Sequence, residues 1–151
     1  MRGTNIFMKS TALLIDTNII LDWLLEREPF VSYANRIMEH CISGRIKGYL
    51  ALHSILNIFY ITRNKFDIEA QIEIGLMLCE KFHIIGITPE MLQRTLKSDS
   101  LKDLEDGLQM QCAVEYDLDY IITRDIKGFR NSRISVLLPE DFLTLLPTST
   151  T

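Results

Sequence analysis

Short apolar runs alternate with longer amphipathic segments along almost the whole chain, and this alternation limits the fold more than any single motif does. Each run is bounded by turn residues or by a helical pattern, which is typical of buried strands. The strands expected from these runs are Thr11–Asp16, Gly48–Leu52, Phe82–Ile87, Tyr120–Thr123 and Ile134–Leu138. Strands separated by helices pair in parallel, so we expect an α/β fold with helices on both faces of one sheet.

The intervening segments carry apolar residues three or four positions apart, the spacing of a helix that buries one face. The helices expected from this spacing are Asn18–Glu26, Phe30–Ser43, His53–Asn64, Asp67–Lys81, Leu104–Tyr116 and Pro139–Leu145. Another helix should begin at Thr88, because proline follows as its first helical residue. No linker or repeat interrupts the pattern, so residues 1–151 are expected to form one domain with a core from about residue 12 to 145.

Charge and composition exclude several classes of protein. The formal net charge of −4 argues against bulk electrostatic binding of nucleic acid, although a local basic patch stays compatible with it. No apolar run approaches the ~20 residues of a membrane span, and no signal peptide is recognisable, so we expect a cytoplasmic protein with no membrane contact. Cys41, Cys79 and Cys112 have no metal-binding or disulfide spacing, and we expect all three in the core.

Acidic residues stand where this fold would carry its chemistry. Asp16 and Asp125 each follow an expected strand, and Asp106 lies at the start of an expected helix. Open α/β sheets bind ligands at the carboxyl ends of their strands, so these three side chains can meet. Close carboxylates raise one another's pKa unless a cation sits among them. The pattern therefore predicts a site for Mg²⁺ or Mn²⁺, which prefer oxygen ligands.

Each acid also has a structural alternative. Asp16 could cap the helix that follows it, and Asp125 could be a turn residue before Gly128. Asp103 and Asp106 would both favour the positive end of the helix that begins at residue 104. We favour capping for Asp103 and leave the two interpretations of Asp106 open.

The densest basic stretch, R-D-I-K-G-F-R-N-S-R, surrounds Asp125. It could hold a nucleic-acid backbone beside the metal, with Phe129 stacked on a base. The candidate substrate-binding residues are Arg124, Lys127 and Arg130, with Arg133 nearby. The alternative is a solvated loop whose Phe129 packs into the core. His53 could also approach the site, but a lone histidine is more often a structural residue.

Together these motifs resemble the PIN-domain family of metal-dependent ribonucleases. The resemblance rests on D-T-N after the first strand, D-L-E-D-G-L-Q at a helix start and Y-I-I-T-R-D at a late strand. The segments R-E-P-F and L-P-E-D-F agree with a subgroup of stand-alone bacterial PIN proteins. The resemblance extends from about Ala12 to Leu145, and the order of the motifs is more specific than any one of them.

The resemblance implies a three-layer α/β/α sandwich with a five-stranded parallel sheet, and an acidic site for one or two Mg²⁺ or Mn²⁺ ions. Asp16, Asp106 and Asp125 match the family's first, third and fourth acids, and Asp103 is a further candidate ligand. Thr123 matches the hydroxyl that orients the first acid. Asn18 matches the amide beside that acid.

The chain departs from the family pattern at the second acid. Family members commonly carry glutamate in the helix after the second strand, whereas the matching stretch H-S-I-L-N-I-F-Y offers Asn57. Asparagine can give a neutral oxygen to a metal but supplies no charge, so the affinity for a second ion should fall. The subgroup that the chain most resembles often shows the same replacement.

The implied activity is metal-assisted hydrolysis of single-stranded RNA, in which bound water attacks the phosphodiester. The resemblance also implies a homodimer and a small antitoxin partner whose tail occupies the acidic crevice. The alternative is a non-catalytic PIN-like module that binds RNA or protein through a weakened metal site. A phosphotransfer enzyme is disfavoured, because no second aspartate stands two residues after Asp16.

Overall fold

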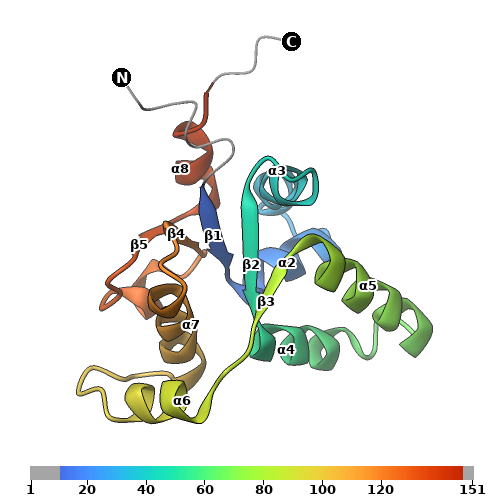
Figure 1. The fold of residues 1–151 in the computed structure, drawn as a ribbon. Helices are drawn as coiled ribbons and strands as arrows, with labels where there is room; N and C mark the ends of the chain where they lie inside the picture. The colour runs from blue at the N-terminus through green and yellow to red at the C-terminus, as the bar shows by residue number, and fades with distance from the viewer. Residues whose placement is uncertain (1–10, 148–151) are drawn as a thin grey trace.

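A five-stranded sheet lies at the centre of the computed structural model, which describes residues 11–147. All strands are parallel, in the order β3-β2-β1-β4-β5 (Figure 1). Their bounds are β1 Ala12–Ile15, β2 Lys47–Ala51, β3 His83–Ile85, β4 Tyr120–Ile122 and β5 Ser135–Leu137. The α/β fold with a five-stranded parallel sheet is therefore confirmed, and each strand lies within two residues of its predicted bounds.

Every predicted helix is present. The helices are α2 Thr17–Leu24, α3 Val31–Ile42, α4 Leu52–Thr62, α5 Ile68–Lys81, α6 Pro89–Leu96, α7 Leu104–Glu115 and α8 Pro139–Thr144. Thr88 caps α6 by accepting a hydrogen bond from the Met91 backbone N–H, as its sequence predicts. A 3₁₀ helix, η1 Ile126–Phe129, was not predicted and follows β4 directly.

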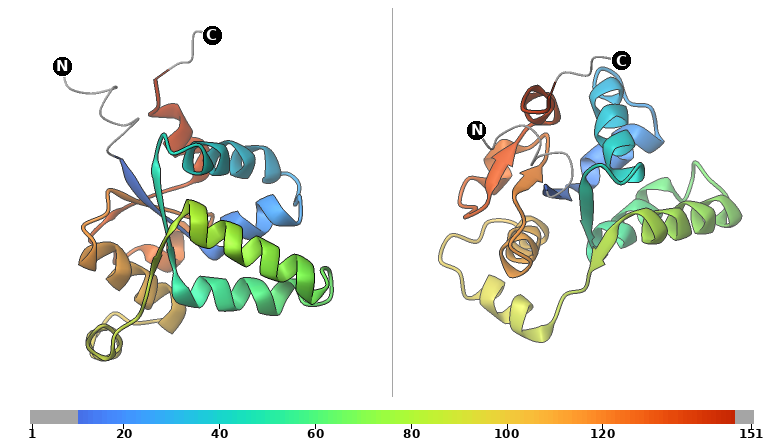
Figure 2. Two further views of the ribbon diagram at one scale, coloured as in Figure 1. Left: turned by 45° about the vertical axis from the view of Figure 1, so that its right-hand side comes forward. Right: turned by 45° about the horizontal axis from the view of Figure 1, so that its top comes forward.

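Strand residues alternate between two separate cores, one on each face of the sheet. Leu13 and Ile15 of β1 pack with α2, α3, α4, α5 and α8, whereas Leu14 faces α6, α7 and η1. Figures 1 and 2 show α6 and α7 on one side of the sheet and α2 to α5 on the other. The side chains of a strand point alternately to opposite faces, so this arrangement is the three-layer sandwich that was expected.

The order of the strands reverses beside β1, and this creates the crevice that the site needs. The chain moves outward from β1 through β2 to β3, then returns to the other side of β1 for β4 and β5. Ile15 pairs with Ile122, and the backbone N–H of Asp16 donates to the Ile122 oxygen at 2.9 Å. Asp16 and Thr123 therefore lie side by side at the carboxyl edge, where α/β proteins of this kind bind ligands.

The cysteines only partly match the prediction. Cys41 and Cys112 are buried, and burial raises the pKa of each thiol to about 12. Cys79 is exposed, contrary to expectation, because it lies on the outer face of α5 with Ile72 and Leu76. Among the helices of residues 11–147, none is both long enough and apolar enough to cross a membrane.

Candidate active site

Asp16 is the most firmly held of the three predicted acids. It follows β1, caps α2 and is only 6% exposed. Its Oδ1 atom accepts hydrogen bonds from the Thr17 backbone N–H at 2.7 Å and from Gln109 Nε2 at 2.6 Å. Its Oδ2 atom accepts a third from Thr123 Oγ1 at 2.6 Å. Three donors stabilise the charge of a carboxylate that burial would otherwise destabilise, and they fix its orientation.

Thr123 connects the first acid to the last. Its side chain is fully buried, and its hydroxyl donates a hydrogen bond to Asp16. The same hydroxyl oxygen accepts the backbone N–H of Asp125 at 2.9 Å. A hydroxyl can do both because it has one proton and two lone pairs. The position of Asp125 is therefore coupled to that of Asp16 through one buried side chain.

Asp106 and Asp125 approach each other across Gly128. Asp106 lies in the first turn of α7, and Asp125 caps η1 by accepting the Gly128 backbone N–H at 3.2 Å. A Cβ atom at Gly128 would lie 2.6 Å from Asp106 Oδ2 and 2.7 Å from Asp125 Oδ2. Both oxygens thus border the same small space, and only glycine leaves it open.

The surroundings of Asp106 disfavour its charged form. Burial, and after it the neighbouring charges of Asp103, Asp16, Asp125 and Glu105, together raise the pKa of this carboxyl to about 7. The acids that sequence placed together are therefore close enough to repel one another. A divalent cation among them would relieve this repulsion.

An open cavity of about 410 Å³ gives access to the acids. Its lining includes Asp103, Asp106 and Asp125, and also the basic residues Lys102, Lys127 and Arg130. Lys127 and Arg130 thus lie at the mouth of the acidic site, where sequence placed them. Asp16 is buried and does not line this cavity.

The donor set suits Mg²⁺ or Mn²⁺, which bind oxygen ligands. In residues 11–147, no three His, Cys, Asp or Glu side chains already surround one point with metal-binding geometry. Asp16 is hydrogen-bonded to Gln109 and Thr123, while Asp106 and Asp125 border the space beside Gly128. Because Mg²⁺ usually keeps several waters, a site with few direct protein ligands still fits such an ion.

Two buried side-chain oxygens near Asp16 could also bind an ion or water. Asn18, in the first turn of α2, and Gln109, which contacts Asp16, each have a side-chain oxygen that is buried. Within the part of the chain that the structure describes, neither oxygen has a hydrogen-bond partner. Buried polar atoms are usually satisfied, so water or a cation is the expected partner for such oxygens.

The remaining candidate ligands have distinct positions. Asp103 caps α7 by accepting the Asp106 backbone N–H at 2.9 Å, which is the role favoured from sequence, and it also lines the cavity. Asn57 is half-buried on α4 and does not line the cavity. It shares a helix face with Ser54, which accepts from the Thr17 hydroxyl at 2.8 Å. His53 contacts the Glu105 backbone oxygen at 3.1 Å, so the start of α4 lies against α2 and α7.

The structure corrects the prediction for Arg124 and decides between the two alternatives left open for Phe129. Arg124 does not line the cavity, because its Nε and Nη2 donate to the buried carboxylate of Asp22 at 2.6 and 3.1 Å. Its guanidinium also lies 3.8 Å from the ring centre of Phe30. A buried charge needs such a partner, so Arg124 belongs to the framework of the site. Phe129 is 1% exposed and packs in the core, so it does not stack on a base.

Gln109 was missed by sequence reasoning. It is 2% exposed on α7, one helical turn after Asp106, between the buried residues Leu108 and Cys112. A polar residue on the apolar face of a helix is a signal that could have identified it, because buried polar groups need partners. The amide of Gln109 donates to one oxygen of Asp16, and Thr123 donates to the other.

Comparisons with known proteins agree with the fold. A family model described as PIN domain matches residues 12–127. A chain of a toxin–antitoxin complex from Klebsiella pneumoniae is 22% identical, with a TM-score of 0.64 over 84% of this chain and 97% of that one. FitAcB from Neisseria gonorrhoeae is 16% identical, with a TM-score of 0.64 over 85% and 98% of the two chains.

A third similar structure is that of VapC20 from Mycobacterium tuberculosis, described as a toxin that cleaves the sarcin-ricin loop. It is 10% identical to this chain, with a TM-score of 0.58 over 72% of this chain and 86% of that one. No curated protein matches the chain. At these identities the solved structures establish a common fold and no more.

The raised pKa of Asp106 gives the metal-free protein a defined pH dependence. Folding raises the pKa of Asp106 from 3.8 to about 7, so the folded state holds the Asp106 proton more tightly than the unfolded state does. The resulting stabilisation is complete below the unfolded pKa and is lost as the pH rises through the folded pKa. In EDTA, the Tm should fall between about pH 5 and about pH 7.5, and Asp106→Asn should reduce that fall. The exposed Asp117→Asn is the control, and a fall that both variants share equally with the parent would contradict the account.

Proposed function

The chain belongs to the PIN-domain family, and from that premise we propose that it is a metal-dependent endoribonuclease that hydrolyses single-stranded RNA. The observation that carries the proposal is the gathering of carboxylates at one edge of the sheet, where Asp106 and Asp125 border the space beside Gly128. The similar fold of a toxin described as cleaving the sarcin-ricin loop supports RNA as the substrate.

Asp16, Asp106 and Asp125 are the residues that would hold Mg²⁺ or Mn²⁺, with Asp103 and Asn57 as further candidates. The ion, when bound, supplies the positive charge that activates water at neutral pH and stabilises the transition state of phosphodiester hydrolysis. Thr123 and Gln109 keep Asp16 in one orientation by donating to its two oxygens. The product is expected to carry a 5′ phosphate, as the family resemblance implies.

Lys127 and Arg130 are the residues proposed to bring the substrate to an acidic protein. Both are exposed, and both line the cavity that contains Asp106 and Asp125. Phosphate contacts from such side chains position a nucleic acid without reading its sequence. Arg124 is not part of this set, because its guanidinium is bound to Asp22.

A second candidate function is a PIN-like module that binds RNA or protein without cleaving it. Asn57 favours it, because asparagine brings no charge to the position where family members commonly carry a glutamate ligand. The absence of three acids already surrounding one point in residues 11–147 is compatible with it as well. The two functions share the same fold and differ in whether RNA is hydrolysed.

We also propose a small antitoxin protein as partner, because a structure with this fold is described as a toxin–antitoxin complex. The tail of such a partner would enter the acidic cavity and block it. The cytoplasmic location expected from the sequence belongs to the same proposal.

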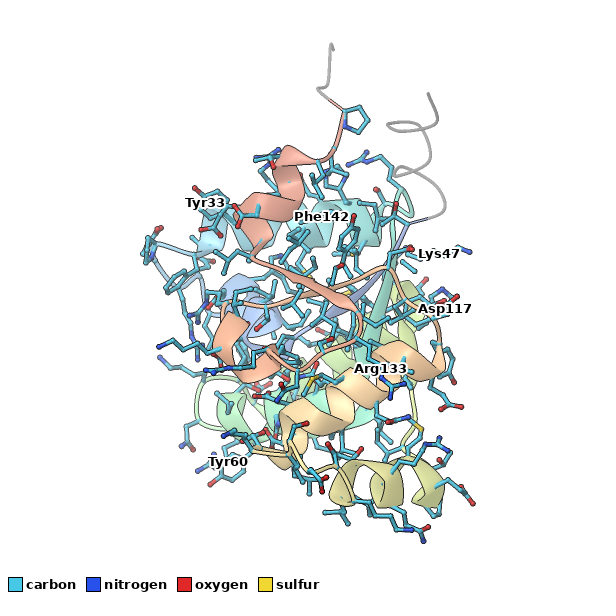
Figure 3. The ribbon with its side chains drawn as sticks, turned by 90° about the vertical axis from the view of Figure 1, so that its left-hand side faces the viewer. Tyr33, Lys47, Tyr60, Asp117, Arg133 and Phe142 are labelled. Atoms are coloured by element: carbon cyan, nitrogen blue, oxygen red, sulfur yellow. The ribbon has the colours of Figure 1, made fainter. Side chains whose placement is uncertain are left out.

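A homodimer is proposed through the outer faces of α4 and α5, which project beyond the sheet (Figures 1 and 2). Apolar side chains recur there at four-residue spacing and are exposed. They are Leu52, Leu56 and Tyr60 on α4, and Ile68, Ile72 and Leu76 on α5. Tyr60 points outward in Figure 3. An exposed apolar face of this kind marks a protein interface.

Cleavage is tested by incubating labelled single-stranded RNA with Mn²⁺ and the purified chain. The parent should cut the RNA, and Asp125→Asn should slow cutting by about a hundredfold or more, since it removes a group that stabilises transition-state charge. Asp117→Asn, an exposed change of the same kind, should cut like the parent. RNA that the parent binds but leaves intact would favour the binding module.

The role of Asn57 is tested by restoring the acid. Asn57→Glu should tighten Mn²⁺ binding, measured by calorimetry, on the order of tenfold, because added ligand charge raises the affinity for a divalent cation. Asn64→Glu, beyond the end of α4, makes the same charge change and should have no such effect. Equal Mn²⁺ affinity in the parent and Asn57→Glu would place residue 57 outside the metal site.

The dimer is tested by charging its proposed apolar face. The double variant Leu56→Lys and Leu76→Lys should sediment as a monomer, because paired lysines cannot be buried without partners. Leu96→Lys is the matched control, since Leu96 is similarly exposed but lies on α6. A parent that is monomeric, or a double variant that stays dimeric, would refute this interface.

A further inference from the structure

The acidic cavity continues into a second and larger cavity. This groove, of about 670 Å³, is lined by α6, α7 and the loop that precedes β5. The two cavities share Ser100, Met110 and Asn131 in their linings. A chain molecule that is bound at Asp106 and Asp125 can therefore extend from the acidic cavity into the groove.

The groove carries positive charge that the rest of the protein does not neutralise. Lys97, at the end of α6, and Arg133, before β5, are both exposed and both line it. Within residues 11–147 neither side chain forms an ion pair, whereas Arg94 is paired with Glu115 at 3.0 Å. Figure 3 shows Arg133 beside α7. In a protein of net charge −4, two cations that the protein itself leaves unpaired favour an anionic ligand in this groove.

The floor of the groove is closed and partly apolar. A Cβ atom at Gly107 would lie 2.7 Å from Leu101 Cδ1 and 2.8 Å from Thr95 Cγ2. Thr95 of α6 and Leu101 of the loop after it therefore pack directly on α7 at this glycine. Leu101, Met110 and Val114 contribute apolar surface to the lining. Cations on the rim and an apolar floor match a single strand, whose phosphates and base faces lie on different sides.

We propose that this groove binds the nucleotides of single-stranded RNA that flank the cleaved bond, with Lys97 and Arg133 contacting their phosphates. The inference rests on the proposed function and adds a path for the strand beyond the acidic site. Continuity with the cavity of Asp106 and Asp125 favours RNA over a second copy of the chain. The cations and apolar floor together favour a single strand over a free phosphate ion.

The test measures binding of a fluorescein-labelled RNA of about 12 nucleotides, a length suited to single-strand sites, by fluorescence anisotropy in Mn²⁺. Every protein carries Asp125→Asn so that the RNA stays intact. Lys97→Gln with Arg133→Gln should weaken binding about tenfold. The slope of log K against log salt should become shallower by about 1.4, since each phosphate contact to a single strand contributes about 0.7.

Lys47→Gln with Arg36→Gln is the matched control. It makes the same charge change at exposed positions on β2 and α3, away from the groove. Lys47 lies apart from Arg133 in Figure 3. The control should bind RNA like the Asp125→Asn protein. Circular dichroism checks that each variant folds, and the two single substitutions replace the double one if it does not.

The outcomes separate this inference from the proposed nuclease. If the parent cleaves RNA but the groove variant binds as tightly as the control, the groove inference fails and the nuclease stands. Equal weakening in both double variants would indicate bulk electrostatics and would also overturn it. A groove variant that changes only its sedimentation would assign the groove to a second copy. A parent that neither binds nor cleaves RNA would overturn both proposals.

Discussion

The buried carboxylate of Asp16 is the constraint on which the rest of the site depends. Its charge requires donors, and the fold supplies them from three elements: the start of α2, helix α7 through Gln109, and the end of β4 through Thr123. These contacts join the two strands at which the sheet order reverses. Because α7 also carries Asp106, and Thr123 also binds the Asp125 backbone, placing Asp16 places the other two acids.

The site thus has a buried framework and an exposed rim. The framework includes a second buried charge, Asp22, which Arg124 neutralises while contacting Phe30. This pair ties α2 to the segment after β4, close to Asp125. On the rim, Asp103 and Asp106 face an open cavity with basic residues beside them. Buried charges are costly unless they are paired, whereas the exposed Asp103 and the half-buried Asp106 border the cavity and stay available to a ligand.

Much of the fold could be predicted from the sequence, because strand and helix periodicity is local. The same holds for the positions of Asp16 and Asp125, which follow from where β1 and β4 end. The motif order was enough to indicate the PIN-domain family, which the family match confirms. The role of Asp103 as the cap of α7 was also predictable, since capping depends on neighbouring residues alone.

What sequence could not supply is the choice of tertiary partners. Arg124 stands in a basic stretch like its neighbours, and only the fold brings it to Asp22. Cys79 was misplaced for a related reason, since the exposed side of α5 cannot be assigned without knowing what packs against it, and the two alternatives for Phe129 were decided only by the fold. Gln109 became meaningful only when α7 was seen to lie beside Asp16. Errors of this kind concern the surroundings of single side chains, whereas the strands and α-helices were correct and only the short η1 was missed.

The most direct test of the account is a crystal of the full chain soaked in Mn²⁺, with the metal located by its anomalous scattering. The account predicts a peak at the carboxyl edge of the sheet, within reach of Asp16, Asp106 and Asp125. A well-ordered crystal with no Mn²⁺ at these acids, or with Mn²⁺ bound only elsewhere, would contradict it.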